Sequence, residues 1–182
     1  MSNIATLNTE KAPAKKTVFL PGSTSSKLSL SVPYGRTYAD MIVRGAPQTD
    51  HTIISALGNI SKTFPKLAAV TRKVEVLLVS MPGFTMSRKL ERWVAEQRLV
   101  PIDFHTTLTI SETYPTLVDD WKLKKIRLVS LAHAFVHLSE KRVCTVHYDY
   151  TDQPQAITIS RTVEYEPLKC GWSEEHHFGF LV

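Results

Sequence analysis

The residues of this chain that could bind a metal or move a proton are a few histidines, cysteines and acidic residues in its second half. Cys170, His176 and His177 could supply three ligands of a zinc ion, but no fourth ligand lies nearby in the sequence. His133 and His137 share one face if their segment is a strand, and partly buried, hydrogen-bonded imidazoles are the alternative there. We therefore expect neither a metal nor a cofactor.

The short motifs that mark common enzyme sites are missing from the sequence. It contains no glycine-rich phosphate loop, no Gly-x-Ser-x-Gly elbow, no His-Glu-x-x-His helix and no Cys-x-x-Cys pair. We interpret Asp119 and Asp120 as part of a turn and not as a catalytic carboxylate pair. Cys144 is predicted to lie in the core, because cysteine is among the most buried residue types, with His147 facing the other way. We therefore predict a protein that is not an enzyme.

Clusters of basic residues recur through the chain and stop at residue 142. Dense positive charge suits phosphate backbones or anionic lipid headgroups, and neither requires a sequence code. An ordinary solvated face is the alternative for each cluster alone, and Trp121 beside one of them is a candidate stacking surface. We assign the following residues to nucleic-acid or anionic-lipid binding: Lys11, Lys15, Lys16, Arg72, Lys73, Arg88, Lys89, Arg92, Lys122, Lys124, Lys125 and Arg127.

A short apolar loop is the second candidate site. Met81, Pro82, Phe84 and Met86 lie between a predicted strand and a predicted basic helix, and connecting segments usually run over the surface. Apolar side chains exposed there could insert into a membrane interface or fit a pocket on a neighbouring copy. The alternative is that Phe84 folds back onto the core.

Charge is divided unevenly along the chain. Residues 1–142 hold 20 Lys and Arg against 11 Asp and Glu, whereas residues 143–182 hold 2 against 6. A basic body with an acidic end can attract polyanions through one surface and a second copy through the other, if the charges also cluster in three dimensions. Dispersed, solvated charges are the alternative. We predict an acidic self-association surface made of Glu164, Glu166, Glu174 and Glu175.

Length and composition favour one domain in a reducing compartment. The chain has 182 residues, of which 43% are hydrophobic and 21% charged, enough apolar material for one core. Two cysteines are too few for a disulfide framework, and we expect neither a secretory signal nor a span of the roughly 20 apolar residues that a bilayer requires. Any contact with a membrane is therefore expected to be peripheral.

The periodicity of apolar residues predicts the elements that must position these side chains. It indicates a single α+β domain, in which an antiparallel sheet packs with two to three helices. Residues 1–16 are small, polar and lysine-bearing and predict a disordered basic arm, and residues 17–182 form the domain with its acidic C-terminal segment. Alternation predicts strands over 28–32, 74–79, 104–110, 126–138, 144–150 and 156–166. Three- and four-residue spacing predicts helices over 38–45, 51–60 and 86–97 and a further turn from Pro65 to Val70. One face of the sheet is expected to be solvated.

Several segments, taken in order, are similar to those of a known family. Gly35-Arg36-Thr37-Tyr38-Ala39-Asp40 follows a strand, Asp50-His51 opens an apolar helix, and a buried strand precedes the apolar loop. Val143–Tyr150 ends in an acidic turn, and Phe178–Val182 is a terminal Phe-Gly-aliphatic run. This order resembles that of the matrix proteins of rhabdoviruses.

The resemblance implies a virion structural protein, found also in the host cytoplasm and at the membrane periphery. It would self-associate, condense the helical nucleoprotein–RNA complex and link it to the inner face of the envelope, where the glycoprotein tail is a further candidate partner. The family's basic arm would correspond to Lys11, Lys15 and Lys16, and its exposed loop to Met81–Met86. The arm lacks the Pro-Pro-x-Tyr motif of animal-infecting members, which suits a divergent, plant-infecting member. The acidic 164–177 stretch does not match the family's last helix, so the resemblance does not extend to the fold of this segment.

Three functions from different classes remain open. The first, which we favour, is the non-enzymatic matrix protein. The second is a viral RNA-binding or capsid protein that never contacts a membrane. The third is an enzyme whose site assembles in three dimensions around His133, His137 or His147.

Overall fold

The computed structural model describes residues 24–64, 68–153, 156–168 and 171–182. The predictions for the basic arm, including Lys11, Lys15 and Lys16, lie outside these residues, and so does Cys170. The described chain combines five α-helices with a mostly antiparallel sheet of seven strands, which confirms the predicted α+β class.

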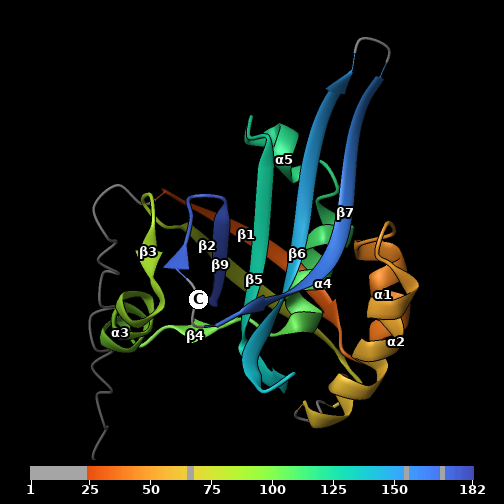
Figure 1. Cartoon of the computed structure of the whole chain (residues 1–182), viewed down its shortest axis with the longest axis horizontal. Coiled ribbons are helices and arrows are strands. Elements are labelled where there is room, and N and C mark those ends of the chain that lie inside the picture. Colours follow the sequence, from red (N-terminus) through yellow and green to blue (C-terminus); the bar gives the residue numbers. More distant parts are fainter. Residues whose placement is uncertain (1–23, 65–67, 154–155, 169–170) are drawn as a thin grey trace, which may run out of the picture.

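The main sheet has the spatial order β1-β2-β9-β5-β6-β7, with a short β4 beside β9 (Figure 1). Its strands are β1 (Thr24–Pro33), β2 (Thr71–Ser80), β4 (Val100–Pro101), β5 (Lys125–His137), β6 (Glu140–Gln153), β7 (Ala156–Pro167) and β9 (His176–Leu181). Neighbours pair antiparallel, except that β5 and β9 run parallel. The C-terminal strand therefore lies in the middle of the sheet, between strands that are distant in sequence.

Helices cover both faces of this sheet (Figure 1). One face carries α1 (Tyr38–Gly45), α2 (His51–Ile60), the 3-10 turn η1 (Ser61–Thr63), α4 (Phe104–Thr113) and the short α5 (Leu117–Asp120). The other carries α3 (Ser87–Gln97) and the two-stranded ribbon of β3 (Thr85–Met86) and β8 (Gly171–Trp172). Leu78 lies in the first core and Leu77 in the second, because successive residues of a strand point to opposite faces.

The predicted helix starts are confirmed by their caps. Thr37 precedes α1, and its side chain accepts a hydrogen bond from the Asp40 N–H at 3.2 Å. Asp50 precedes α2, and its Oδ1 accepts from the Thr52 N–H at 2.7 Å. Each cap satisfies an N–H that has no partner within the helix, so these boundaries could be predicted from local sequence.

The prediction of a strand over Phe104–Ile110 is wrong, because these residues form α4. The Asp103 side chain caps this helix, accepting from the Thr106 N–H at 2.8 Å, and the Thr107 hydroxyl donates to the Asp103 carbonyl. All residues from Phe104 to Ser111 are buried, so the helix has no polar stripe. Threonine and isoleucine favour strands locally, and the enclosed position between α1 and the sheet decides against that preference.

Three smaller predictions are also corrected. The helical turn at Pro65–Val70 is not seen: residues 65–67 lie outside the described chain, and Ala68 to Val70 are not helical. The helices outnumber the predicted two to three because α4 and α5 were missed. The sheet face expected to be solvated is partly covered by α3 and the β3–β8 ribbon. Asp119 and Asp120, expected in a turn, form the last two residues of the short helix α5.

Candidate functional site

The loop between β2 and α3 exposes two large apolar side chains, as predicted. Phe84 is 71% exposed and Met86 is 58% exposed. Met81 is only 1% exposed and belongs to the core beneath α3, so its predicted exposure is wrong. It directly follows the buried half of β2 and continues that strand's contact with the core. The exposed part of the loop therefore begins at Pro82, which is half-buried.

The ring of Phe84 lies on β8 and not in the core. A Cβ atom on Gly171 would lie 1.8 Å from Cζ of Phe84, so the ring covers the glycine backbone directly. Pairing of Thr85 with Trp172 and of Met86 with Gly171 holds the loop against β8. Gly83 makes the turn with a φ of 52°, a conformation that glycine adopts at little cost. The other face of the ring is left open to solvent.

The start of α3 breaks two local rules of helix formation. Met86 occupies the N-cap position and makes no side-chain hydrogen bond there, where Ser, Thr, Asp or Asn is preferred. The first turn contains Arg88 and Lys89 and no acidic residue, although the N-terminal end of a helix carries partial positive charge. Residues that disfavour the local structure without an evident gain in packing indicate a role other than folding.

The basic residues of α3 form no ion pair within the described part of the chain. These residues, Arg88, Lys89 and Arg92, are exposed. Glu91 and Glu96 are also exposed on this helix, so its first half holds three cations and one carboxylate and its second half holds one carboxylate. The first half is the part that adjoins the exposed loop.

A groove of about 660 Å³ borders the loop on its other side. Its lining includes Pro82 and Gly83 of the loop, together with Lys124 and Lys125 from the segment that enters β5. Lys122 is exposed in the same segment, and none of the three lysines forms an ion pair with a described residue. The loop therefore lies between two groups of exposed cations, and the lysines of the groove share its lining with Glu174 and Glu175.

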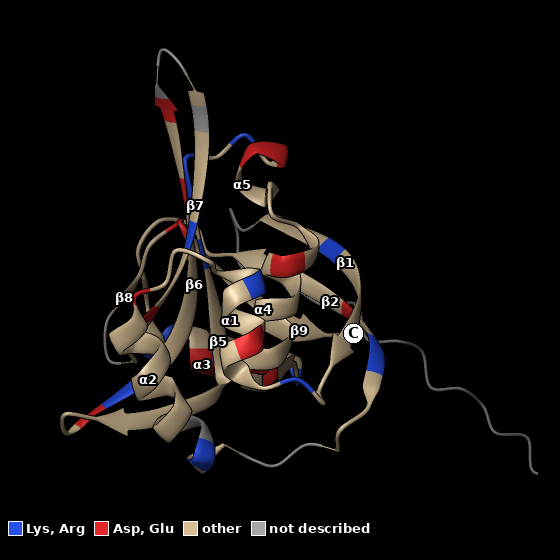
Figure 2. Cartoon of the chain, turned by 90° about the vertical axis from the view of Figure 1, so that its right-hand side faces the viewer, with Lys and Arg blue, Asp and Glu red and all other residues tan. Residues whose placement is uncertain are grey.

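The remaining predicted cations lie elsewhere. Arg72 stacks over the ring of Tyr34 at 5.6 Å, and Lys73 lines a separate groove of about 890 Å³. Figure 2 shows basic and acidic residues interspersed on the side that carries α1 and α4, where Arg36 and Glu112 pair at 2.9 Å. Lys73 thus lines a different groove from Lys124 and Lys125.

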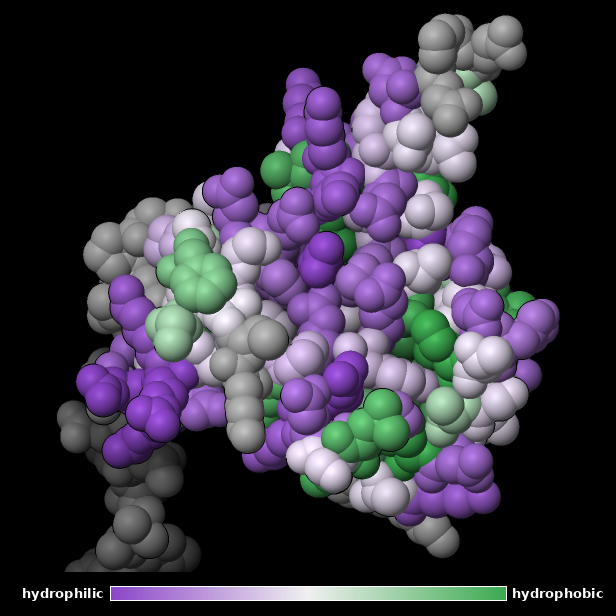
Figure 3. Space-filling model, in the orientation of Figure 1, coloured by the Kyte–Doolittle hydropathy of each residue, from purple (hydrophilic) through white to green (hydrophobic). Residues whose placement is uncertain are grey.

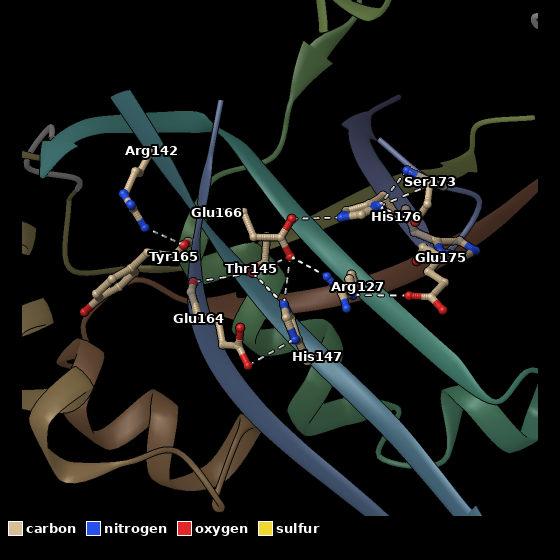
Figure 4. A network of polar contacts seen from close by, with 11 residues as sticks. Arg127, Arg142, Thr145, His147, Glu164, Tyr165, Glu166, Ser173, Glu175 and His176 are labelled. Carbon is tan, nitrogen blue, oxygen red and sulfur yellow. Dashed lines mark hydrogen bonds and ion pairs between the residues drawn. The ribbon is translucent and has the colours of Figure 1, made fainter. Parts of the chain in front are cut away.

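The acidic end is partly engaged within the chain, because Glu166 and Glu175 pair with Arg127 whereas Glu164 and Glu174 are exposed. The self-association surface expected for these four residues stays a prediction. The side chain of Glu166 is only 15% exposed. One of its carboxylate oxygens lies 2.9 Å from Nε2 of His147 and the other 2.8 Å from Nε2 of His176, and Arg127 approaches at 3.4 Å (Figure 4). Arg127 also pairs with Glu175 at 3.3 Å. A predicted binding cation and two predicted self-association residues therefore bind one another.

The electrostatics of this network, which we call the Glu166 network, favour an ionised carboxylate. Burial by itself would raise the pKa of Glu166, but hydrogen bonds from His147 and His176 hold that pKa well below its usual range. Glu164, at 55% exposure, lies 3.4 Å from His147 Nδ1. Glu174 is exposed and lines the groove that also contains Lys124. Two carboxylates of the acidic end, Glu166 and Glu175, are thus paired with Arg127 within the chain.

Ser173, His176 and Glu166 are arranged like the catalytic triad of a hydrolase. Ser173 Oγ lies 2.9 Å from Nδ1 of His176, whose Nε2 faces Glu166. The backbone N–H of Ser173 also donates to the same Nδ1 at 3.0 Å. These contacts hold the tight turn between β8 and β9. That N–H is therefore not free to stabilise an oxyanion. We interpret this arrangement of three residues as structural.

The remaining cysteine and histidine candidates that the structure describes do not come together into a site. Cys144 lies in the core as predicted, and burial raises the pKa of its thiol. His133 stacks on Phe64 at 4.6 Å, but its Nδ1 has no hydrogen-bond partner in the described chain, so the expected satisfied imidazole is not seen there. His176 and His177 are consecutive in β9 and point to opposite faces. The described residues contain no group of three metal-binding side chains.

Comparison with known proteins identifies no relative of this chain. It matches no protein-family model, no curated protein and no solved structure. Within the described residues, no helix has both the length and the apolar character needed to cross a bilayer. Gly171 is the residue of the candidate site that the sequence did not reveal, because its contact with Phe84 exists only in the folded chain.

Proposed function

We propose that this is a non-enzymatic matrix protein that binds an anionic membrane peripherally through the surface formed by Phe84, Met86, Arg88, Lys89 and Arg92. We call these five residues the loop–helix surface. In this proposal the protein also self-associates and links a nucleoprotein–RNA complex to the inner face of a viral envelope. The observation that carries the proposal is that two exposed apolar side chains directly adjoin three uncompensated cations.

The chemistry of the loop–helix surface matches that of a bilayer interface. Burial of an exposed Phe or Met side chain in an apolar medium contributes roughly 1.5–3 kcal/mol. Each cation near an anionic leaflet adds about 1 kcal/mol, and stable peripheral binding generally needs both contributions. Phe84 and Met86 supply the first, and the basic start of α3 supplies the second.

The groove lysines support the nucleoprotein–RNA part of the proposal. Lys122, Lys124 and Lys125 are exposed and form no ion pair with a described residue, and Lys124 and Lys125 line a concave surface together with Glu174 and Glu175. Phosphate contacts need positive charge and no base readout. The same observation favours the second candidate function, an RNA-binding or capsid protein without membrane contact, in which the loop would contact protein instead.

Phe84→Asp tests the membrane proposal directly. Because the ring lies on the surface of β8, we expect the free energy of unfolding to change by less than about 1 kcal/mol. We expect binding to vesicles of phosphatidylcholine and phosphatidylserine to fall at least tenfold, measured by co-sedimentation at fixed salt. Val43→Asp is the matched control, because Val43 is 63% exposed on α1, which covers the opposite face.

The outcomes separate the two candidate functions. Vesicle binding that is lost in Phe84→Asp and kept in Val43→Asp supports the matrix proposal. A wild-type protein that ignores vesicles at every salt concentration, but binds single-stranded RNA in a salt-dependent manner, would support the second function and reject the first. Self-association is followed in the same series by sedimentation of the protein alone at decreasing salt.

A further inference from the structure

The turn between β5 and β6 presents an apolar residue in a strained conformation. Leu138 and Ser139 form the two-residue loop, with φ angles of 49° and 66°. Positive φ at both loop residues is the signature of a type I′ turn, for which Asn-Gly is strongly preferred. A bulky residue in this conformation is rare and costs of the order of 1 kcal/mol or more.

Nothing in the described chain packs against this leucine to compensate for the strain. Leu138 is 79% exposed and Val136 is 74% exposed, the two highest values among the exposed large hydrophobic residues. Other left-handed residues are explained by their place: Arg98 ends α3, where its N–H bonds to the carbonyls of Val94 and Ala95. An exposed, strained, apolar turn is instead typical of a contact surface.

The turn faces the same side of the sheet as the loop–helix surface. Val136 pairs with Lys141, so these two side chains are neighbours on one face. Val143, two residues after Lys141 on β6, belongs to the core beneath α3, which identifies that face. Figure 3 shows two apolar patches on one side of the molecule, one over the loop before α3 and one over the end of the β5–β6 hairpin.

The charges around the turn suit an anionic surface. Glu140 is the acidic residue of the turn, and it pairs with Arg142 at 2.8 Å. Lys141 is exposed and forms no ion pair with a described residue. The apolar tip therefore has an uncompensated cation beside it, the same combination of apolar and basic side chains as at the loop–helix surface.

We infer that the tip of the β5–β6 hairpin, through Val136 and Leu138, is a second point of contact with the anionic membrane. This inference rests on the proposed function and extends it. A convex turn can enter a lipid interface, and two separate apolar points on one face fix the orientation of the protein on the bilayer, which a single loop cannot do. This contact explains why an apolar residue occupies a strained position, because Asn and Gly, which the turn prefers, could not supply an apolar side chain.

Two substitutions at neighbouring positions distinguish this contact from a purely structural turn. Leu138→Asn places the preferred residue at the first turn position, so we expect a higher melting temperature together with about tenfold weaker binding to phosphatidylcholine–phosphatidylserine vesicles. Ser139→Gly relieves strain at the second position but keeps the leucine, so the melting temperature should rise with vesicle binding unchanged. Val136→Thr keeps the β-branched shape and should weaken binding in the same direction as Leu138→Asn.

Failure of this inference is distinguishable from failure of the proposed function. If Leu138→Asn binds vesicles like the wild type while Phe84→Asp does not, the hairpin contact is rejected and the loop–helix surface remains. If both variants bind like the wild type, both proposals are rejected. If Leu138→Asn weakens self-association without vesicles and leaves vesicle binding intact, the tip contacts a second copy of the chain and the lipid assignment is overturned.

Discussion

The Glu166 network and the loop–helix surface both concentrate charge, but the charges are paired in the network and unpaired within the described chain at the surface. In the network, a carboxylate with 15% exposure is bonded to two histidines and approached by an arginine. At the loop–helix surface, Arg88, Lys89 and Arg92 have no ion pair with any described residue and adjoin exposed Phe84. The first arrangement is complete within the chain, whereas the second lacks a partner.

This difference separates charge that stabilises the fold from charge that is available for binding. A buried carboxylate must be hydrogen-bonded, because an unpaired charge in the interior is costly. Exposed cations contribute little to stability, and at the start of a helix they oppose its dipole. We therefore assign the network to folding and propose that the loop–helix surface binds a partner. Substitutions at Glu166 and Met86 test that assignment, and His133 offers a buried group outside both regions for comparison.

Replacement of Glu166 should have the largest effect. Glu166→Ala leaves His147 and His176 without their shared acceptor in a buried setting, so we expect the free energy of unfolding to fall by about 2–3 kcal/mol. Denaturant unfolding at pH 7 measures this loss. Glu164→Ala is the control: Glu164 is 55% exposed, and its loss should cost less than about 0.5 kcal/mol. Equal effects of the two variants would remove the distinction between network and surface.

An intermediate effect is expected at His133, with a defined pH dependence. Burial lowers the pKa of His133 below the value of about 6.5 that it has in the unfolded chain, despite the nearby charge of Asp103. As the pH falls below about 6.5, the unfolded state therefore takes up a proton more readily than the folded state, and stability is lost. Burial lowers the pKa values of His105 and His177 as well, so the three act in the same direction.

His133→Phe should keep the stacking on Phe64 and remove the unpaired Nδ1. We expect stability at pH 7 to rise by about 1 kcal/mol and the loss between pH 7 and 5 to become smaller, although His105 and His177 maintain part of it. Thermal unfolding across this pH range measures both. An unaltered pH profile would show that His133 does not contribute to acid sensitivity.

The smallest change in stability, and the sharpest contrast, is expected at Met86. Met86→Ser introduces the missing cap of α3, so the free energy of unfolding should rise by about 0.5–1 kcal/mol while vesicle binding weakens. Met86→Leu keeps the apolar side chain without adding a cap and should leave both quantities close to the wild type. A variant Met86→Ser that gains stability and binds vesicles fully would place Met86 outside the binding surface.

Features that depend on neighbouring residues could be predicted from the sequence, whereas features that depend on distant residues could not. The caps at Thr37 and Asp50 and the exposure of Phe84 rest on neighbouring residues, and these predictions are confirmed. The enclosed helix α4 was mistaken for a strand because every side of it is buried, which removes the periodic signal. Met81 was placed on the surface because sequence does not show where the burial of a strand ends.

By itself, the sequence determined the α+β class, most strand and helix positions, and the apolar character of the loop before α3, since hydrophobic period and capping act over a few residues. Only the tertiary structure decided which charges remain available. Insertion of β9 between β2 and β5 brings His176 to Glu166 and Glu175 to Arg127, and it engages two carboxylates of an acidic end that looked separate along the chain. Pairing between distant strands is not encoded in any local pattern, so the fate of these charges depended on the fold.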